Sequence, residues 1–285
     1  MLRITESVVD EWLRVFVGIL VISCAGMANA EPLQLPAIQV LPLLDSQSGR
    51  SYELYVKVPE DYDARGSVGH PVIYVADAMW HIELISGSLE YLVDDAILVG
   101  VSWDTDISVQ QSRMRDYMPT KYLGDYEHAT GEAESHRDFF ERDVFAYIEA
   151  NFRVDPARRT FFGYSASGTF GAFMLLSKPD MFESYLLGAP ATLFDGGLLH
   201  EDSSIAETTQ NAIEANVFIA VGEDDSPGNV ANAKGLADYL RGKMSRNSKL
   251  EFQIVPAANH GKAFPAVTIQ SLYWLSGITM SVSEE

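Results

Sequence analysis

The chain has 285 residues and a formal net charge of −20, from 40 acidic and 20 basic side chains. Such an acidic surface argues against binding to nucleic acid or to anionic lipid, because both need a basic face. The length suits one α/β domain or two small ones, and the hydrophobic fraction of 47% is enough for a large core.

The first thirty residues have the composition of a secretory signal. An apolar run over 15–22 is followed by small residues and by Ala28-Asn29-Ala30, which fits an Ala-x-Ala cleavage site. The run is too short to span a bilayer. We therefore expect a signal peptide over 1–30, a single domain over 31–285, and a periplasmic or secreted protein.

Cys24 is the only cysteine and lies inside this segment. Residues 21–24 resemble a bacterial lipobox, so a lipid anchor at Cys24 is the alternative to cleavage after Ala30. Cleavage there would leave a mature protein without cysteine, and therefore with neither a disulfide nor a thiol nucleophile.

The predicted elements that follow alternate between strands and helices. From Leu41 to Val58 the sequence alternates between apolar and polar residues, through Ser51 to Val58, which is typical of half-buried strands at an antiparallel entry to a sheet. Further strands are predicted over 71–76, 96–101, 160–162, 185–188, 217–221 and 250–255. Helices are predicted over 135–152, 168–178, 229–244 and 264–275, and the polar stretch 196–215 is expected to flank the site. This alternation favours an α/β fold with a mostly parallel central sheet and helices on both of its faces.

The segment 159–171 contains the most informative pattern. A short apolar strand leads into the tight turn Gly163-Tyr164-Ser165, and a helix of small residues begins near Gly168. Strand, sharp turn and helix are the context in which Ser165 would be an exposed nucleophile. Small neighbours are needed because the strand and the helix pass close together there. Ser167 stands where a second glycine is usual.

A histidine follows the last predicted strand, where a base is needed. A serine hydroxyl is a weak nucleophile at neutral pH and needs a base within hydrogen-bond reach. His260 lies in the loop 257–261, and we expect it near Ser165 because reacting groups gather at the carboxyl ends of parallel strands. The histidines expected to be solvated are His128, His136 and His200.

The acidic loop 222–227 supplies the third group. It follows the strand over 217–221 and contains Glu223, Asp224 and Asp225. Asp225 has the best spacing for the acid that orients the histidine, and Glu223 and Asp224 are the alternatives. The chain order of serine, acid and histidine is that of the α/β hydrolases.

The oxyanion that forms when a serine attacks a carbonyl carbon needs backbone donors. One is the N–H group of Ala166, directly after the nucleophile. The other is expected from the turn 77–80, which follows the predicted strand 71–76.

Several segments resemble the esterase D-like family of α/β hydrolases, which includes S-formylglutathione hydrolase, feruloyl esterases and mycolyltransferases. Residues 71–78 (PVIYVADA) are similar to its strand and turn. Residues 99–101 (VGV) and 113–119 (RMRDYMP) are similar to the siderophore-esterase-like bacterial branch. Residues 139–156 resemble a helix of the family, and 187–191 stand where it has a short Ser-Pro motif. The resemblance covers residues 52–275.

This resemblance implies an α/β-hydrolase fold and a serine esterase that acts on carboxylic esters without a cofactor. It implies Ser165 as nucleophile, His260 as base and Asp225 as acid, with the backbone amides of Met79 and Ala166 as oxyanion donors. Ala78 and Ser167 stand where the family has glycine.

Three further residues are candidates for substrate binding, namely Trp80, Trp103 and Arg115. Each tryptophan has a place in the core as the alternative. Arg113 and Arg115 would bind an acidic or catecholate group, or else form a structural ion pair with Asp116 or with the helix at Glu141. The expected partner is a small-molecule ester, and we find no metal-ligating cluster in the sequence. Alternative functions are a siderophore trilactone esterase and a non-catalytic binding member of the fold.

Overall fold

The computed structural model describes residues 37–121, 127–191 and 212–283, and Ala37–Glu285 cluster as one compact unit. The expected signal segment, Cys24 and most of the stretch 196–215 lie outside the described residues. No helix of the described ranges is long and apolar enough to cross a membrane.

Eight strands form one sheet in the order β1-β2-β4-β3-β5-β6-β7-β8. β1 and β2 pair antiparallel, β2 also pairs antiparallel with β4, and all other pairs are parallel. The strands are β1 (Ile38–Leu44), β2 (Ser51–Lys57), β3 (His70–Val75), β4 (Ile97–Val101), β5 (Val154–Tyr164), β6 (Ser184–Gly188), β7 (Asn216–Gly222) and β8 (Leu250–Val255). The predicted mostly parallel sheet is confirmed.

The burial of the strands follows their sequence patterns. In β2 every second residue is buried, as its alternating pattern predicts. In β4 and β6 every residue is buried, because helices cover both faces of the sheet at its centre. β5 is the longest strand and lies between β3 and β6, so the turn that follows it stands at the middle of the sheet edge.

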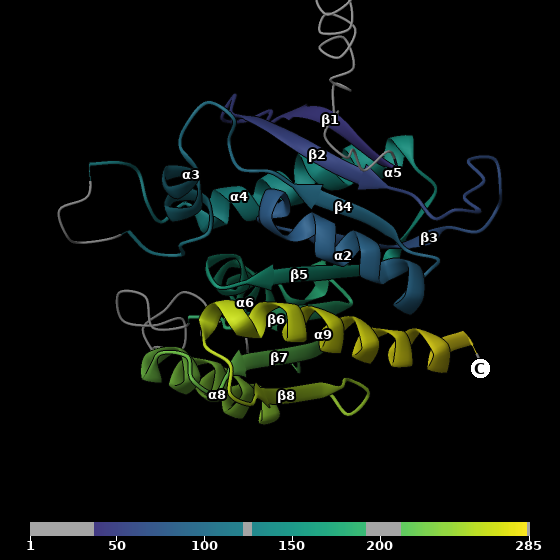
Figure 1. Ribbon diagram of the computed structural model, residues 1–285. Helices are drawn as coiled ribbons and strands as arrows, with labels where there is room; N and C mark the ends of the chain where they lie inside the picture. The colour runs from purple at the N-terminus through teal and green to yellow at the C-terminus, as the bar shows by residue number, and fades with distance from the viewer. Residues whose placement is uncertain (1–36, 122–126, 192–211, 284–285) are drawn as a thin grey trace, which may run out of the picture. The chain divides into compact units, whose positions relative to one another are not determined.

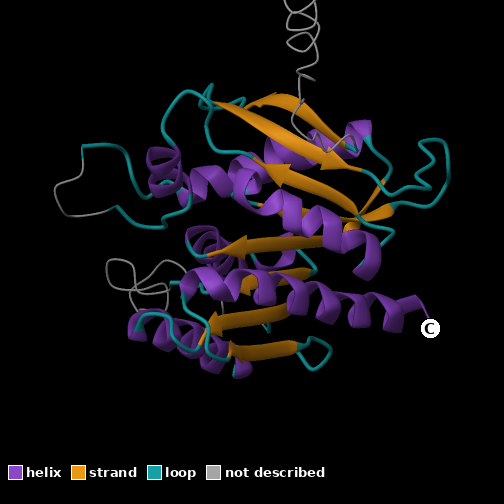
Figure 2. Cartoon of the chain, viewed as in Figure 1, coloured by secondary structure: helices purple, strands orange, loops and turns teal. Residues whose placement is uncertain are grey.

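Helices cover both faces of this sheet (Figure 2). α2 (Ala78–Leu92) and α9 (His260–Ser283) lie together on one face, where Figure 1 shows them crossing in front of the strands. The other helices of the described residues are α3 (Val109–Asp116), α4 (Ala133–Phe139), α5 (Ala146–Asn151), α6 (Ala166–Ser177) and α8 (Pro227–Arg241). α6 packs on β5 and β6, and α8 packs on β7 and β8. Short turns at η1 (Phe140–Phe145) and η2 (Pro179–Met181) complete the described elements.

The region predicted as one helix over 135–152 is more complex. It consists of α4, the π-helical turn η1 and α5. His136, expected to be solvated, is 4% exposed and lies among aromatic rings. That expectation was wrong because the polar character of its neighbours in sequence says nothing about which face of the helix meets the core.

Candidate active site

Ser165 stands on a sharp turn between β5 and α6, as the sequence pattern predicts. Its backbone angles are φ 60° and ψ −119°, and its N–H donates to the carbonyl of Gly188 over 2.8 Å. A positive φ at a residue with a side chain is strained and must be held by its surroundings. A Cβ on Gly163 would lie 2.3 Å from the Ser167 carbonyl oxygen, and one on Gly168 would lie 2.6 Å from that of Gly188. The turn therefore needs both glycines.

Ser167 has a definite role in this turn. Its hydroxyl accepts from the N–H of Tyr164 over 3.0 Å and donates to the carbonyl of the same residue over 2.9 Å. The side chain is fully buried. Serine replaces the usual glycine here without disturbing the turn, because its hydroxyl pairs with the strand end.

Three side chains from distant parts of the chain form one hydrogen-bonded path. The Ser165 Oγ is 2.9 Å from the His260 Nε2, and the His260 Nδ1 is 2.7 Å from the Asp225 Oδ2. An ionised carboxylate only accepts hydrogen bonds, so Nδ1 carries a proton and donates a hydrogen bond to Asp225. Nε2 is then free to accept the serine proton, which is the protonation state that a general base requires.

The three acidic residues of the loop after β7 are separated by what they contact. Asp225 also accepts from the Ser226 N–H over 2.7 Å and from the Asn229 side chain over 2.9 Å. Burial acts to raise the pKa of Asp225, but hydrogen bonds from His260, Asn229 and the Ser226 N–H outweigh it and lower the pKa below its ordinary value. Asp225 therefore stays ionised beside the imidazole.

Glu223 holds the histidine loop rather than the histidine. Its carboxylate accepts from the N–H of Ala257 over 2.9 Å, and Ala257 has a positive φ of 52°. The N–H of Asp224 donates to the Ala258 carbonyl over 3.0 Å. These contacts join the two loops that carry the acid and the base.

Tyr164 is a contact of His260 that the sequence did not indicate. Its hydroxyl donates to the His260 carbonyl over 2.5 Å, and its ring lies 5.3 Å from the imidazole. Burial, followed by the charge of Asp225, raises the pKa of Tyr164 well above its ordinary value, so the hydroxyl stays protonated. The residue before the nucleophile thus fixes the start of α9.

The two predicted oxyanion donors each lie in the first turn of a helix. Ala166 is the first residue of α6 and Met79 the second residue of α2, where N–H groups have no acceptor within the helix. Ala78 fits in place of the family's glycine because it faces Gly100, whose missing side chain leaves room for the Ala78 methyl group. Both helices start at the same sheet edge, since β3 and β5 are parallel neighbours.

An aromatic wall beside the turn 77–80 is formed by Trp80, Trp103 and Arg113. The two indole rings are 4.8 Å apart and inclined by 66°, and the Arg113 guanidinium lies 4.7 Å from the centre of the Trp80 ring. Trp80 is 55% exposed, which leaves it accessible to a ligand.

Arg115 is not available for substrate. It is 6% exposed and donates to Asp104 over 3.0 Å and to Asp116 over 2.6 Å. This corrects its prediction as a substrate-binding residue in favour of the alternative, a structural ion pair with Asp116.

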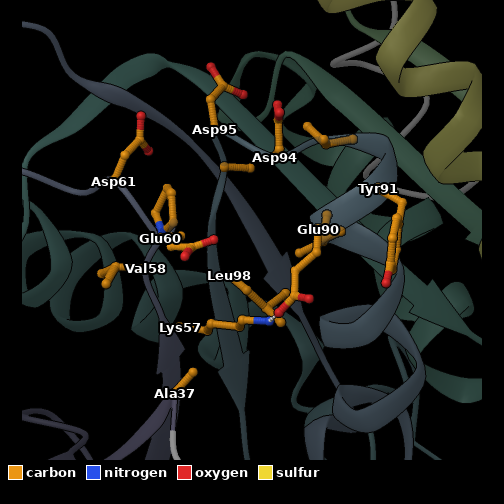
Figure 3. Close-up of a pocket in the computed structure, with 14 residues that line it drawn as sticks. Ala37, Lys57, Val58, Glu60, Asp61, Glu90, Tyr91, Asp94, Asp95 and Leu98 are labelled. Carbon is orange, nitrogen blue, oxygen red and sulfur yellow. Dashed lines mark hydrogen bonds and ion pairs between the residues drawn. The ribbon is translucent and has the colours of Figure 1, made fainter.

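A cavity of about 690 Å³ lies away from the triad (Figure 3). It is lined by the end of β2, the end of α2 and the start of β4, which belong to the opposite edge of the sheet from Ser165. Lys57 bonds to Glu90 beside it, and Asp94 and Asp95 stand on its rim. No residue of the triad lines this cavity.

The fold and the hydrogen-bonded serine, histidine and aspartate define a serine hydrolase of the α/β-hydrolase class. Similarity to known proteins defines the family more closely. The chain belongs to the esterase family, because residues 46–279 match the family model described as "Putative esterase".

Several individual proteins are similar to the chain. The ferri-bacillibactin esterase BesA of Bacillus subtilis is 26% identical over 268 residues, covering 87% of this chain and 91% of BesA. The BES protein from Bacillus cereus has a TM-score of 0.75 at 21% identity, over 87% of this chain and 97% of that one. The IroE-like serine hydrolase from Shewanella oneidensis has a TM-score of 0.71 at 22% identity, over 84% and 80%. The two solved structures share the fold of this chain, and the family match together with BesA supports an enzyme that hydrolyses carboxylic esters.

Proposed function

We propose that this protein hydrolyses carboxylic esters through an acyl-enzyme on Ser165, with His260 as general base and Asp225 as its orienting acid. The observation that carries the proposal is the hydrogen-bonded path from the serine hydroxyl through the imidazole to the buried carboxylate. The side chain of Asp225 is 3% exposed and that of His260 is 41% exposed, so the base faces the solvent side while its partner is shielded.

The chemistry follows from this arrangement. The Ser165 Oγ attacks the ester carbonyl carbon while its proton passes to the His260 Nε2. The carbonyl oxygen becomes an oxyanion beside the amides of Ala166 and Met79, and loss of one such donor costs about 2.7–4 kcal/mol in another hydrolase. The carbon–oxygen bond to the alcohol then breaks, and the alcohol oxygen takes the proton from His260. Water repeats the sequence on the acyl-enzyme and releases the acid.

Hydrolysis of p-nitrophenyl acetate and butyrate tests this proposal. We expect Ser165→Ala to lower kcat by about 10⁶-fold, as for the nucleophile of another serine hydrolase. A fluorophosphonate probe is expected to label Ser165 in peptide mapping. Ser88→Ala, at the far end of α2, is the matched control and should keep full turnover. Wild-type turnover by Ser165→Ala, or a folded protein that the probe does not label, would instead favour a non-catalytic binding member of the fold.

A second candidate substrate is a siderophore trilactone. BesA carries the name of a siderophore esterase, and the aromatic wall offers this site two indole rings and a guanidinium. Planar aromatic groups stack on indole, and a guanidinium pairs with the oxygens of a catecholate. An enterobactin-type trilactone brings both kinds of group to the ester.

Product analysis decides between the two substrates. The protein is incubated with ferric and apo enterobactin-type trilactones, and linear products are sought by mass spectrometry. We expect Trp80→Ala to raise KM for the trilactone while KM for a simple aliphatic ester such as ethyl acetate stays near the wild-type value, because ethyl acetate has no aromatic ring to stack. Absence of linear products would leave the simple esterase and remove the siderophore substrate.

We also propose that the protein is exported and that residues 1–30 are removed. The apolar run and Ala28-Asn29-Ala30 support this, with a lipid anchor at Cys24 as the alternative. The intact mass of protein recovered from cell fractions tests it. A chain that begins at Glu31 in the periplasm or the medium is expected. A lipid-modified chain that begins at Cys24, or a full-length cytoplasmic chain, would contradict cleavage after Ala30.

A further inference from the structure

Asp77 is a buried carboxylate to which the triad chemistry assigns no role. It lies two residues after the end of β3, directly before α2, and is fully buried, with φ 55° and ψ 35°. A left-handed conformation is strained at a residue other than glycine and persists only where the surroundings hold it. The residues after it open α2, so the angles at Asp77 decide where the Met79 N–H points. Residues 77–80, which carry this N–H, form the oxyanion turn.

Four hydrogen bonds with three other residues hold Asp77. Its carboxylate accepts from the Trp103 Nε1 over 2.6 Å and from the Arg113 Nε and Nη2 over 2.8 and 3.0 Å. Its own backbone N–H donates to the Tyr117 hydroxyl over 3.2 Å. A bidentate arginine–carboxylate pair fixes direction as well as distance. The side-chain direction and the backbone of Asp77 are therefore both fixed.

The same donors build the aromatic wall. Arg113 stacks on Trp80, and Trp103 packs against Trp80 edge to face. Trp80 is itself the last residue of the oxyanion turn. Asp77 therefore links the aromatic wall to the oxyanion turn. Its carboxylate binds Trp103 and Arg113 of the wall, and its backbone belongs to the turn that carries the Met79 amide.

We propose that Asp77 is a positioning residue that aims the Met79 amide at the developing oxyanion and holds the aromatic wall in register with it. The inference rests on the proposed ester hydrolysis at Ser165 and assigns the buried Asp77–Arg113–Trp103 cluster to transition-state stabilisation. Asp77 contacts no reacting atom, and its effect passes through the backbone of the turn.

The proposal predicts a loss in kcat rather than in substrate binding. Asp77→Asn keeps the size of the side chain but removes the charge that holds Arg113. A misplacement of about 1 Å costs about 100-fold in rate, so we expect kcat for p-nitrophenyl acetate to fall about 10- to 100-fold. KM should change by less than about 3-fold, because the lost interaction exists only in the transition state. Affinity for a small boronic acid, whose adduct places an oxygen at the oxyanion position, should fall in parallel with kcat.

Two milder variants distinguish an effect on the position of the Met79 amide from an effect on folding. Trp103→Phe keeps an aromatic ring but loses the indole N–H, and Arg113→Lys keeps the charge but loses the bidentate geometry. Both should show smaller losses of the same kind. Asp45→Asn is the matched control, because Asp45 is also a buried carboxylate paired with an arginine, Arg142, but lies at the end of the edge strand β1. It should lower thermal stability without changing kcat per active site.

All rates are measured per serine that reacts with a fluorophosphonate, so partial unfolding does not enter them. Parallel losses in kcat and boronate affinity in the Asp77, Trp103 and Arg113 variants, absent from Asp45→Asn, would support the proposal. Constants within about 2-fold of the wild type in all of these variants would overturn it and leave the esterase function intact. Failure of the wild-type protein to react with the probe would overturn both.

Discussion

Asp225 and Glu223 are two residues apart in one loop, yet they bond to different groups. Asp225 reaches the imidazole of His260, whereas Glu223 reaches the backbone of Ala257. We expect Asp225→Asn to lower kcat by about 10⁴-fold, because the amide no longer holds the imidazole in the tautomer that accepts the serine proton. Steady-state kinetics on p-nitrophenyl butyrate measures the loss.

Glu223→Gln is the matched comparison for that change. The amide oxygen still accepts from the Ala257 N–H, so kcat should fall far less than in Asp225→Asn, and the melting temperature is the more sensitive measure. Equal losses of kcat in the two variants would contradict the assignment of Asp225 as the acid.

The hydrogen-bonded path of Ser165, His260 and Asp225 was predictable because each residue lies at a short-range sequence signal, a tight turn or the loop after a strand. Arg113 and Arg115 were not separable in this way. They are two residues apart on α3, so they point to different sides of the helix. One meets Asp77 and the other meets Asp104 and Asp116. Only the rotation of α3 against the sheet decides which arginine lies near the site.

At the scale of elements, the contact between α6 and β6 depends on glycine. A methyl group on Gly168 would lie 2.6 Å from the backbone oxygen of Gly188, which cannot move without shifting β6. We expect Gly168→Ala to lower the free energy of unfolding by several kcal/mol, or about 1–3 kcal/mol if the backbone relaxes. Urea unfolding followed by circular dichroism measures it.

Gly235 provides the control within the same chain. It lies inside α8, and a Cβ there would meet nothing within 4 Å. Gly235→Ala should stabilise the protein by about 0.5–1 kcal/mol, because alanine loses less conformational freedom in a helix. A destabilising Gly235→Ala together with a neutral Gly168→Ala would refute the packing account.

The elements themselves were largely predictable, since continuous apolar runs between turn residues indicate buried strands and amphipathic helices have a clear period. The π-helical turn η1 was not, because a π turn differs from an α turn only in which carbonyl each N–H reaches. The helix α9 begins earlier than its apolar pattern, at His260, and contains Pro265. Pro265 is the sixth residue of α9, so it removes the hydrogen bond that an N–H there would donate to the carbonyl of Gly261.

At the scale of the whole molecule, His136 links stability to pH. It lies among five aromatic rings at centroid distances of 5.2 to 5.7 Å, and its Nε2 has no hydrogen-bond partner. Burial lowers the pKa of His136 below its ordinary value, although the charge of Asp116 acts against this. The folded protein therefore keeps this imidazole neutral in a range where the unfolded chain binds a proton.

The sign of the pH effect follows directly. Because the unfolded chain takes up a proton near pH 6.5, the free energy of unfolding should decline as the pH falls below about 6.5. His136→Phe should flatten that decline in urea titrations between pH 5 and 8, while a variant of the exposed His128, His128→Gln, should leave it unchanged. An identical slope in His136→Phe and the wild type would contradict this origin.

The paired indoles of Trp80 and Trp103 have an optical consequence. Two inclined indole rings with centroids 4.8 Å apart are expected to couple their strongest transitions and to give a paired band in the far-ultraviolet circular dichroism spectrum. Since Trp80 is the exposed partner, a molecule that enters beside it will change the band without any dye or chromogenic ester. The band therefore reports ligand binding beside Trp80, so the affinities of unlabelled natural compounds can be compared directly in solution.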